Sequence, residues 1–457
     1  MWSSAPLIGR TASVVAGMLS AVAFGFTVRA LLDHDQAGRH ALKAGVMLAF
    51  GVWVGTEVQV TAGLCLGVVA LKWVVDGGKW LAINRRMALG LALGLASALA
   101  VERGAGVLDV QYDRLSIVHV SLSVLILGFW SVVALLGERL RGAASRLAAE
   151  ACADVVIIAV MMALFPKVLL SPLHDVDPVL LGVFASVAEY APVSDPWRFL
   201  IYAGAVVFAL PWAVLRAAQE QGSERWGWLL LAAGLAAYTV FRLNWIRWSM
   251  YIGLFSSMAL AHLIVRADGT LDGLGPAVRT VSKVAVLLAF AVGPFTVGMA
   301  GVVGTSQAPA KTTAIAEPVD GDARPCPVRA MSGFLNAAPW GDKPHMILSS
   351  ANDGAELLYR TPHRVMGTLH HPNARGILDS IRIFAGAGDD ETLALVRQRR
   401  VDLVLVCRRW GGGAYKAAGG GRSLHQRLKE GDAPNWLTEV VLPQALGRAF
   451  RLYKVGS

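Results

Sequence analysis

Charged residues are scarce in this chain. Only 16% of its 457 residues are Asp, Glu, Lys or Arg, against about 25% in an average soluble protein. The mean hydropathy over the whole length is +0.52. This balance excludes a soluble enzyme and indicates that most of the chain has hydrocarbon as its solvent. One helical membrane domain and one modest soluble domain account for the length.

Cysteine is also rare, and no cysteine pattern of a metal site is present. The four cysteines include no CxxC pair and no Cys/His spacing typical of zinc. Cys65 and Cys152 lie in apolar segments and are interpreted as small core residues. Cys326 and Cys407 both fall in the soluble domain, where an oxidising compartment would permit a disulfide. Neither Gly-Gly-Gly cluster precedes a Lys-Ser/Thr pair, which argues against a phosphate loop.

Basic residues outnumber acidic ones, giving a formal net charge of +10 and a pI near 9.7. A single basic patch would point to nucleic acid as a partner. Here the basic residues are spread over short loops between apolar segments, where they set orientation in a membrane. We therefore expect membrane lipid, and not nucleic acid, as a partner.

Long apolar segments make up residues 1–303 and predict about ten transmembrane helices. The segments lie near residues 12–30, 41–56, 58–75, 87–101, 117–136, 147–165, 198–215, 226–240, 245–264 and 284–303. The odd-numbered loops carry most of the basic residues and are predicted to be cytoplasmic. Loops 102–116 and 166–196 are more balanced or acidic, and are predicted to lie outside with both termini. Because no cleavable signal pattern precedes the first segment, either that helix inserts backwards or the start of a longer chain is missing.

The composition changes abruptly after the last apolar segment. Residues 304–325 are rich in Pro, Ala, Thr and Asp and are predicted to be a linker. In residues 326–457, short β-type runs are separated by helical patterns, which predicts an α/β domain. The runs lie at 345–349, 364–369, 402–407 and 449–455, and the helical patterns at 376–385 and 389–400.

Loop 166–196 is the first place where chemistry is expected, because a loop of ~30 residues between membrane helices is usually functional. His174, Asp175 and Asp177 offer nitrogen and oxygen ligands of the kind that metal ions take. The aspartates also fit ordinary turn or cap positions. Glu189 lies in an otherwise apolar stretch, where a carboxylate is costly without a partner. It is the stronger candidate ligand for Mg²⁺ or Mn²⁺.

Two arginines, Arg242 and Arg247, lie at the outer end of the hairpin between the segments 226–240 and 245–264. Arg242 is compatible with a side chain that merely reaches the membrane interface among tryptophans. Arg247 is predicted to lie deeper, in the following helix. An arginine inside a membrane is by default the partner of an anion. Either a lipid phosphate or pyrophosphate, or a plain Arg–Glu ion pair, would satisfy it.

Several of these motifs together resemble the catalytic subunits of oligosaccharyltransferases, members of the GT-C superfamily of membrane glycosyltransferases. Ser186-Val187-Ala188-Glu189 resembles the Ser-Val-Ser-Glu motif of their fifth external loop, and Arg247 resembles the arginine that they present to the donor pyrophosphate. In the outer domain, four stretches follow the order of the segment that begins Trp-Trp-Asp-Tyr-Gly in the family. These are Ile347–Gly354, His370-His371-Pro372-Asn373, Asp390-Glu391 and Val401–Val406.

The resemblance implies an α-helical polytopic membrane protein with a C-terminal α/β periplasmic domain, in a bacterial inner membrane. It also implies inverting transfer of a sugar or glycan from a polyprenyl-phosphate donor, assisted by a divalent metal. Glu189 would be a metal ligand, Arg247 and Arg242 would hold the donor phosphate, and Asp353, His370 and His371 would line the acceptor side.

The chain departs from the family pattern in two respects. Family members have thirteen crossings, so the first three helices, with the loop that carries the catalytic aspartate, would lie upstream of Met1. No catalytic residue is therefore assigned. Ser350 and Ala351 replace the tryptophan pair, so recognition of an Asn-x-Ser/Thr acceptor is not supported. A partner subunit could supply the missing carboxylates.

Two other classes stay open at the level of sequence. A catalytically inactive homologue that binds lipid-linked glycans, or acts as a scaffold, would fit the missing carboxylates. A transporter would fit the helix number, but no inverted repeat or acidic relay is visible.

Overall fold

The computed structural model describes eleven stretches of the chain. They are residues 4–33, 35–136, 139–170, 177–178, 180, 195–270, 275–305, 326–368, 373–409, 415 and 421–456. The chain forms two compact units. The larger unit comprises Arg10–His174 and Ala188–Pro309, and the smaller comprises Met1–Gly9, Asp175–Val187 and Ala310–Ser457. The last division falls inside the stretch expected to be a linker.

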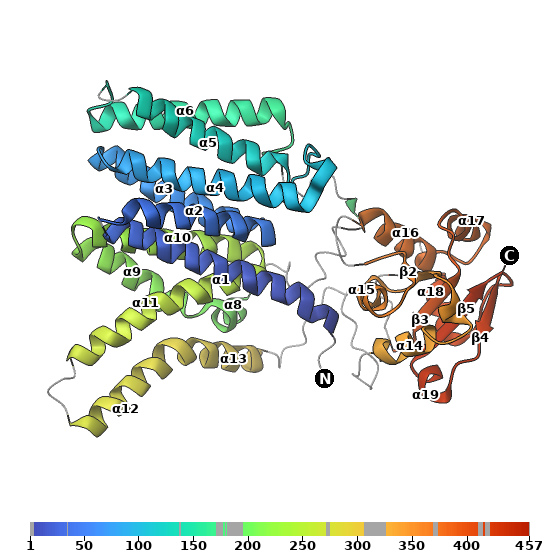
Figure 1. The fold of residues 1–457 in the computed structure, drawn as a ribbon. Helices are drawn as coiled ribbons and strands as arrows, with labels where there is room; N and C mark the ends of the chain where they lie inside the picture. The colour runs from blue at the N-terminus through green and yellow to red at the C-terminus, as the bar shows by residue number, and fades with distance from the viewer. Residues whose placement is uncertain are drawn as a thin grey trace. The chain divides into compact units, whose positions relative to one another are not determined.

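The larger unit is built of helices, several of which run side by side (Figure 1). In chain order they are α1 (Ser4–Leu32), α2 (Ala37–Val54), α3 (Val58–Asp76), α4 (Trp80–Arg103), η1 (Gly104–Gly106), α5 (Ile117–Leu136), α6 (Ala143–Leu164), α8 (Pro196–Ala203), α9 (Val206–Gln219), α10 (Gly222–Asn244), η4 (Ile246–Trp248), α11 (Ser249–Thr270), α12 (Pro276–Leu287), η5 (Leu288–Val292) and α13 (Gly293–Thr305). All ten apolar segments that the sequence indicates lie on these helices. The polytopic helical fold is thus confirmed.

Fewer than ten of the described helices have the length and composition expected of a transmembrane span. Among the described residues, seven helices are long and apolar enough to cross a membrane, or nine if two bent pairs are each one span. Helix α2 is not among them because Arg39, His40 and Lys43 lie in its first two turns and lower its hydropathy.

The two bent pairs were expected to be continuous helices. Helices α8 and α9 meet at 65°, and α12 and α13 at 45°. The second bend contains a π-type turn just before Pro294. Proline has no N–H to donate to the preceding turn, so the helical hydrogen-bond ladder is interrupted there. The first bend follows Ala203, and a Cβ added at Gly204 would overlap Pro294.

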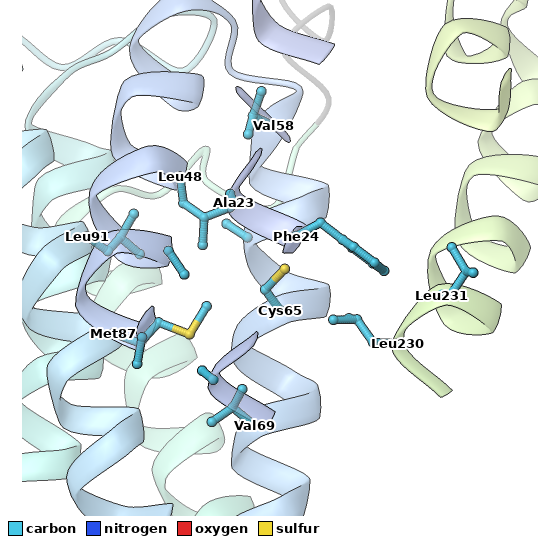
Figure 2. Packing of buried hydrophobic residues seen from close by; sticks show 14 of the residues in the cluster. Ala23, Phe24, Leu48, Val58, Cys65, Val69, Met87, Leu91, Leu230 and Leu231 are labelled. Atoms are coloured by element: carbon cyan, nitrogen blue, oxygen red, sulfur yellow. The ribbon is translucent and has the colours of Figure 1, made fainter. Parts of the chain in front are cut away.

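Helices α2 and α4 pack unusually closely because small residues face each other. A Cβ at Gly45 would overlap the carbonyl oxygen of Met87, and one at Gly90 would overlap the carbonyl oxygen of Leu42. In hydrocarbon no hydrophobic force draws helices together, so close packing of this kind is the main source of stability. Around this pair, side chains from α1, α2, α3, α4 and α10 form one buried core (Figure 2).

Contacts between loops define the two ends of the larger unit. At one end, which we name the Glu57 end, Glu57 contacts Arg247, and the Thr56 hydroxyl lies 3.4 Å from the carbonyl oxygen of Asp113. These contacts join the α2–α3, α4–α5 and α10–α11 connections. At the other end, Arg146 donates hydrogen bonds to the carbonyl oxygens at the end of α3. The basic loops of the sequence lie at this second end.

The smaller unit contains a five-stranded sheet with the strand order β2-β1-β3-β5-β4. Its strands are β1 (Met346–Leu348), β2 (Arg364–Val365), β3 (Leu403–Cys407), β4 (Leu437–Val440) and β5 (Phe450–Val455). Strand β1 pairs in parallel with β2 and β3, while β5 pairs antiparallel with β3 and β4. The α/β domain is confirmed, with β4 as a strand that the sequence analysis missed.

Helices complete the smaller unit (Figure 1). They are α14 (Val328–Leu335), η6 (Trp340–Asp342), α15 (Ala351–Arg360), α16 (Ala374–Ala385), α17 (Asp390–Gln398), α18 (Leu424–Glu430) and α19 (Gln444–Gly447). Every residue of β3 is buried, and alternate residues belong to two separate cores. The sheet is therefore covered on both faces, as its continuous apolar sequence requires. A disulfide joins Cys326 to Cys407, whose Cα atoms are 6.2 Å apart.

Candidate functional site

Arg247 lies at the junction of two helices and not deep within one. It belongs to the short helix η4, which follows an extended Trp245 at the end of α10. Its Nη2 atom is 3.1 Å from Oε1 of Glu57, and the two side chains are 32% and 14% exposed. The sequence analysis placed Arg247 deeper and allowed either a lipid anion or a glutamate as partner. The structure provides the glutamate.

Arg242 is the arginine that is truly buried. It lies in the last turn of α10 and is 0% exposed. Within the described part of the chain, none of its three guanidinium nitrogens has a hydrogen-bond partner. Its central carbon lies 5.5 Å from the centroid of the Tyr202 ring on α8. The guanidinium is enclosed by the protein, which does not favour the alternative of a side chain that merely extends to the membrane interface.

A layer of aromatic rings fixes the helix ends that carry these arginines. Tyr238 stacks on Tyr251, with ring centroids 4.7 Å apart, and Trp248 contacts both rings. The Tyr238 hydroxyl is 2.6 Å from the hydroxyl of Thr61 on α3. Helices α3, α10 and α11 are thus locked together just below the Arg247–Glu57 pair. A rigid support of this kind holds charged side chains in one geometry.

Further polar contacts lie near the ends of α2 and α4 and the start of α5. The Trp53 indole donates a hydrogen bond of 2.8 Å to Glu102, and Arg103 donates one of 2.6 Å to Gln111. His119 is buried and is hydrogen-bonded to Ser116. These contacts give His119 a packing role.

The structure describes only part of loop 166–196. His174, Asp175 and Glu189 lie outside the described residues, so the prediction that they bind a metal stays a prediction. Asp177 is described, and its Oδ2 lies 4.0 Å from Nη2 of Arg382 on α16. Both residues belong to the smaller unit. This contact favours the structural interpretation of Asp177 over that of a metal ligand.

Of the three residues assigned to the acceptor side, only Asp353 can be placed, because His370 and His371 lie outside the described residues. Asp353 is in the first turn of α15, which Ser350 caps. Burial raises the pKa of Asp353 to about 6, and the nearby carboxylate of Glu356 adds to the rise. Its neighbour Tyr415 is also buried, and its pKa is raised to about 12. An acid that titrates near neutrality in a partly buried place is suited to proton exchange or to hydrogen bonding with a ligand.

No metal site is built from the described side chains. Within the part of the chain that the structure describes, no group of three or more His, Cys, Asp and Glu residues is close enough to hold an ion. Glu57 is already paired with Arg247. The described residues therefore do not fit a metal, and the metal hypothesis depends on Glu189 and, more weakly, on His174 and Asp175.

Among known proteins, matches to this chain are found among solved structures. No family model and no curated protein matches the sequence. The structure of the archaeal oligosaccharyltransferase AglB from Archaeoglobus fulgidus, in complex with an inhibitory peptide and a dolichol-phosphate, matches over 94% of this chain with a TM-score of 0.58 and 13% identity. The chain therefore shares the fold of the matched part of this archaeal protein.

Two more structures of the Archaeoglobus fulgidus oligosaccharyltransferase are similar to this chain. The apo form matches with a TM-score of 0.58 and 12% identity over 94% of this chain. The form tethered to an acceptor peptide that contains the NVT sequon matches with a TM-score of 0.54 and 13% identity over 86% of this chain. These matches cover 55%, 55% and 51% of the respective archaeal chains, so the present chain spans about half their length.

Glu57 is the partner of Arg247 that the sequence analysis did not single out. It stands between two apolar segments, in the short break Gly55-Thr56-Glu57. An acid at a helix end usually meets water, so its position gave no reason to expect an arginine partner. The odd–even alternation of loops does place Glu57 and Arg247 at the same end of the bundle. The alternation of the loops therefore predicts that Glu57 and Arg247 can meet.

Proposed function

We propose that this chain is a membrane glycosyltransferase that transfers a sugar or glycan from a polyprenyl-phosphate donor to an acceptor outside the cytoplasm. The GT-C fold supports the reaction class. One archaeal structure with this fold holds a dolichol-phosphate, which is a polyprenyl-type lipid. A donor of this kind combines an apolar tail, suited to the membrane domain, with an anionic head group.

The buried guanidinium of Arg242 is the single observation that carries the proposal. A cation without a partner costs several kcal/mol in a low-dielectric environment, and side chains of this kind mark ligand or ion sites in membrane proteins. Arginine presents several donors in a planar fork that matches the oxygens of a phosphate. Because the three nitrogens lack partners among the described residues, they are available to a phosphate of the donor.

The pair of Arg247 and Glu57 has a supporting role in this proposal. It ties η4 to the start of α3 and so fixes the turn that follows Arg242. If a donor carries a second phosphate, Arg247 can exchange Glu57 for it, since its side chain is partly exposed. Arg242 is then the primary phosphate ligand and Arg247 the secondary one.

A divalent metal, Mg²⁺ or Mn²⁺, belongs to the proposal only through Glu189. When bound, such an ion would offset the charge on the leaving phosphate. The acceptor would be recognised on the smaller unit, where Asp353 offers a carboxyl group that is partly protonated near neutral pH. His370 and His371 complete this proposed acceptor side.

Two observations support an outward-facing site in a bacterial inner membrane. The basic loops lie at the end opposite to Glu57, as expected if they face the cytoplasm. The disulfide between Cys326 and Cys407 suits an oxidising compartment such as the periplasm. The smaller unit is therefore proposed to be periplasmic.

The function is tested by sugar transfer in membranes that contain the full chain. Membranes are given a radiolabelled polyprenyl-phosphate sugar and Mn²⁺, and the label leaving the lipid fraction is counted. We expect turnover with the unchanged chain, a loss of about 100-fold or more with Arg242→Gln, and little change with Arg198→Gln. Arg198 is an exposed arginine on α8, the helix of Tyr202, and serves as the matched control. Equal turnover in the two variants would contradict the proposal.

A further inference from the structure

A cavity in the smaller unit has no part in the function proposed above. It has a volume of about 560 Å³ and lies where β1 and β3 begin and β5 ends. Those ends share one edge of the sheet, because β1 and β3 are parallel and β5 is antiparallel to β3. Ligand sites for small molecules usually measure several hundred Å³. The cavity is therefore large enough for one or two sugar rings.

Four cations surround this cavity. Lys343 precedes β1, Arg397 and Arg400 lie at the end of α17, and Lys454 is on β5 directly opposite Leu403. All four side chains are exposed, and none forms an ion pair or hydrogen bond with another described residue. Basic side chains on a protein surface usually alternate with acids. Four cationic side chains around one cavity, without an ion-pair partner among the described residues, create a positive potential that attracts anions.

The backbone holds two of these cations in place. Arg400 has a φ of 52°, in the left-handed region that residues other than glycine seldom adopt. This conformation turns the chain sharply between α17 and β3, with hydrogen bonds of 3.0 Å from the Arg400 amide to Arg397 and 3.1 Å from the Val401 amide to Val396. Arg397 and Arg400 are thereby brought to the same rim.

The remaining lining residues are suited to the neutral part of a ligand. The Asp402 carboxylate accepts a hydrogen bond of 2.7 Å from the Met346 amide and lies 3.8 Å from His345. Burial lowers the pKa of His345, although Asp402 opposes the shift, so the imidazole is neutral at pH 7. The Trp340 ring stands edge-on to His345, with centroids 6.2 Å apart. An aromatic ring beside hydrogen-bonding groups is the usual combination for packing against a sugar.

We propose that this cavity binds an anionic saccharide, with the sugar packed on Trp340 and its phosphate or carboxylate held by the four cations. The proposal goes beyond the transfer reaction, because it needs neither Arg242 nor a lipid donor. It is a binding site in the smaller unit and can be tested with no turnover at all.

The test uses the full chain in nanodiscs of phosphatidylcholine and isothermal titration calorimetry. The ligands are glucose 6-phosphate, glucose and inorganic phosphate. We expect glucose 6-phosphate to bind more tightly than either of the others. Arg397→Gln with Arg400→Gln should weaken its binding at least about tenfold. Arg329→Gln with Arg364→Gln should leave it unchanged, since these two arginines are exposed and do not line the cavity.

Two further measurements show which part of the ligand is recognised and whether a lipid head group occupies the cavity instead. Trp340→Leu should abolish the preference for glucose 6-phosphate over inorganic phosphate while leaving phosphate binding intact. In nanodiscs that contain phosphatidylglycerol, binding of glucose 6-phosphate should persist. No binding in phosphatidylcholine, equal binding of inorganic phosphate, or loss of binding to the anionic lipid would each overturn the proposal. The last result would assign the cavity to a lipid head group.

Discussion

The central carbon of the Arg242 guanidinium lies 5.5 Å from the centroid of the Tyr202 ring. Among the described residues, none of its three nitrogens has a hydrogen-bond partner. Five residues later, Arg247 makes an ion pair with Glu57. Two arginines at the same junction thus have opposite environments. Arg242 is buried without a counter-charge among the described residues, whereas Arg247 is partly exposed and has one. The proposed function depends on this difference.

The pair of Glu57 and Arg247 should couple α3 energetically to η4. Removing one partner leaves a partly buried charge alone, whereas removing both does not. We therefore expect Glu57→Gln and Arg247→Met each to lower the free energy of unfolding by about 1–3 kcal/mol, and the double variant to lose less than the sum. Thermal unfolding in detergent would measure the coupling. Strictly additive losses would show that the pair contributes nothing to stability.

The close approach of α2 and α4 should make Gly45 intolerant of any side chain. Gly45→Ala places a methyl group on the Met87 carbonyl and must push the helices apart. We expect a loss of about 2 kcal/mol or more in stability. Gly63 on α3 is the matched control, because a Cβ there meets nothing within 4 Å. Gly63→Ala should be neutral or stabilising by up to about 1 kcal/mol, and equal effects at both sites would contradict the packing described here.

The disulfide should be a main source of stability in the smaller unit. It closes a loop with a sequence separation of 81, for which the chain-entropy argument gives about 4 kcal/mol. Cys326→Ala with Cys407→Ala should lower the unfolding free energy of this unit by about that amount. Thiol counting offers an independent check. The denatured chain should react at Cys65 and Cys152 alone before reduction and at all four cysteines afterwards.

Asp353 should make the stability of the smaller unit depend on pH. Its pKa is raised from the ordinary 3.8 to about 6, chiefly by burial. A raised pKa means that the stabilising contribution of the protonated acid is complete below about pH 4 and is lost as the pH rises through 6. Asp353→Asn should therefore stabilise the unit at pH 7.5 relative to the unchanged chain, by on the order of 2 kcal/mol. At pH 4 the difference should vanish, and urea midpoints at the two pH values would show whether it does.

Much of the fold could be predicted from the sequence, because its signals are long and repeated. Apolar segments mark every membrane helix, and the loop charges give their alternation. The bends at Gly204 and before Pro294 were not foreseen, since proline and glycine are common in membrane helices that stay straight. Strand β4 was missed because Leu437-Thr438-Glu439-Val440 is too short to show a pattern.

The candidate site was only half predictable. The sequence selected both arginines but ranked their burial in the wrong order. Depth was inferred from the position in the chain, whereas burial depends on which neighbouring helix covers the side chain. One neighbour of Arg242 is the Tyr202 ring on α8, 40 residues earlier in the sequence. Single-sequence periodicity carries no information about such contacts.

Binding of a polyprenyl monophosphate is the most direct measurement of the central claim. It requires no acceptor, metal or turnover, and it separates the phosphate site from every other part of the reaction. With the full chain in detergent, calorimetric titration of geranylgeranyl phosphate should give saturable binding, weakened at least about tenfold by Arg242→Gln and partly restored by Arg242→Lys. Arg198→Gln should bind as the unchanged chain does. An affinity that is the same with and without Arg242 would contradict the account.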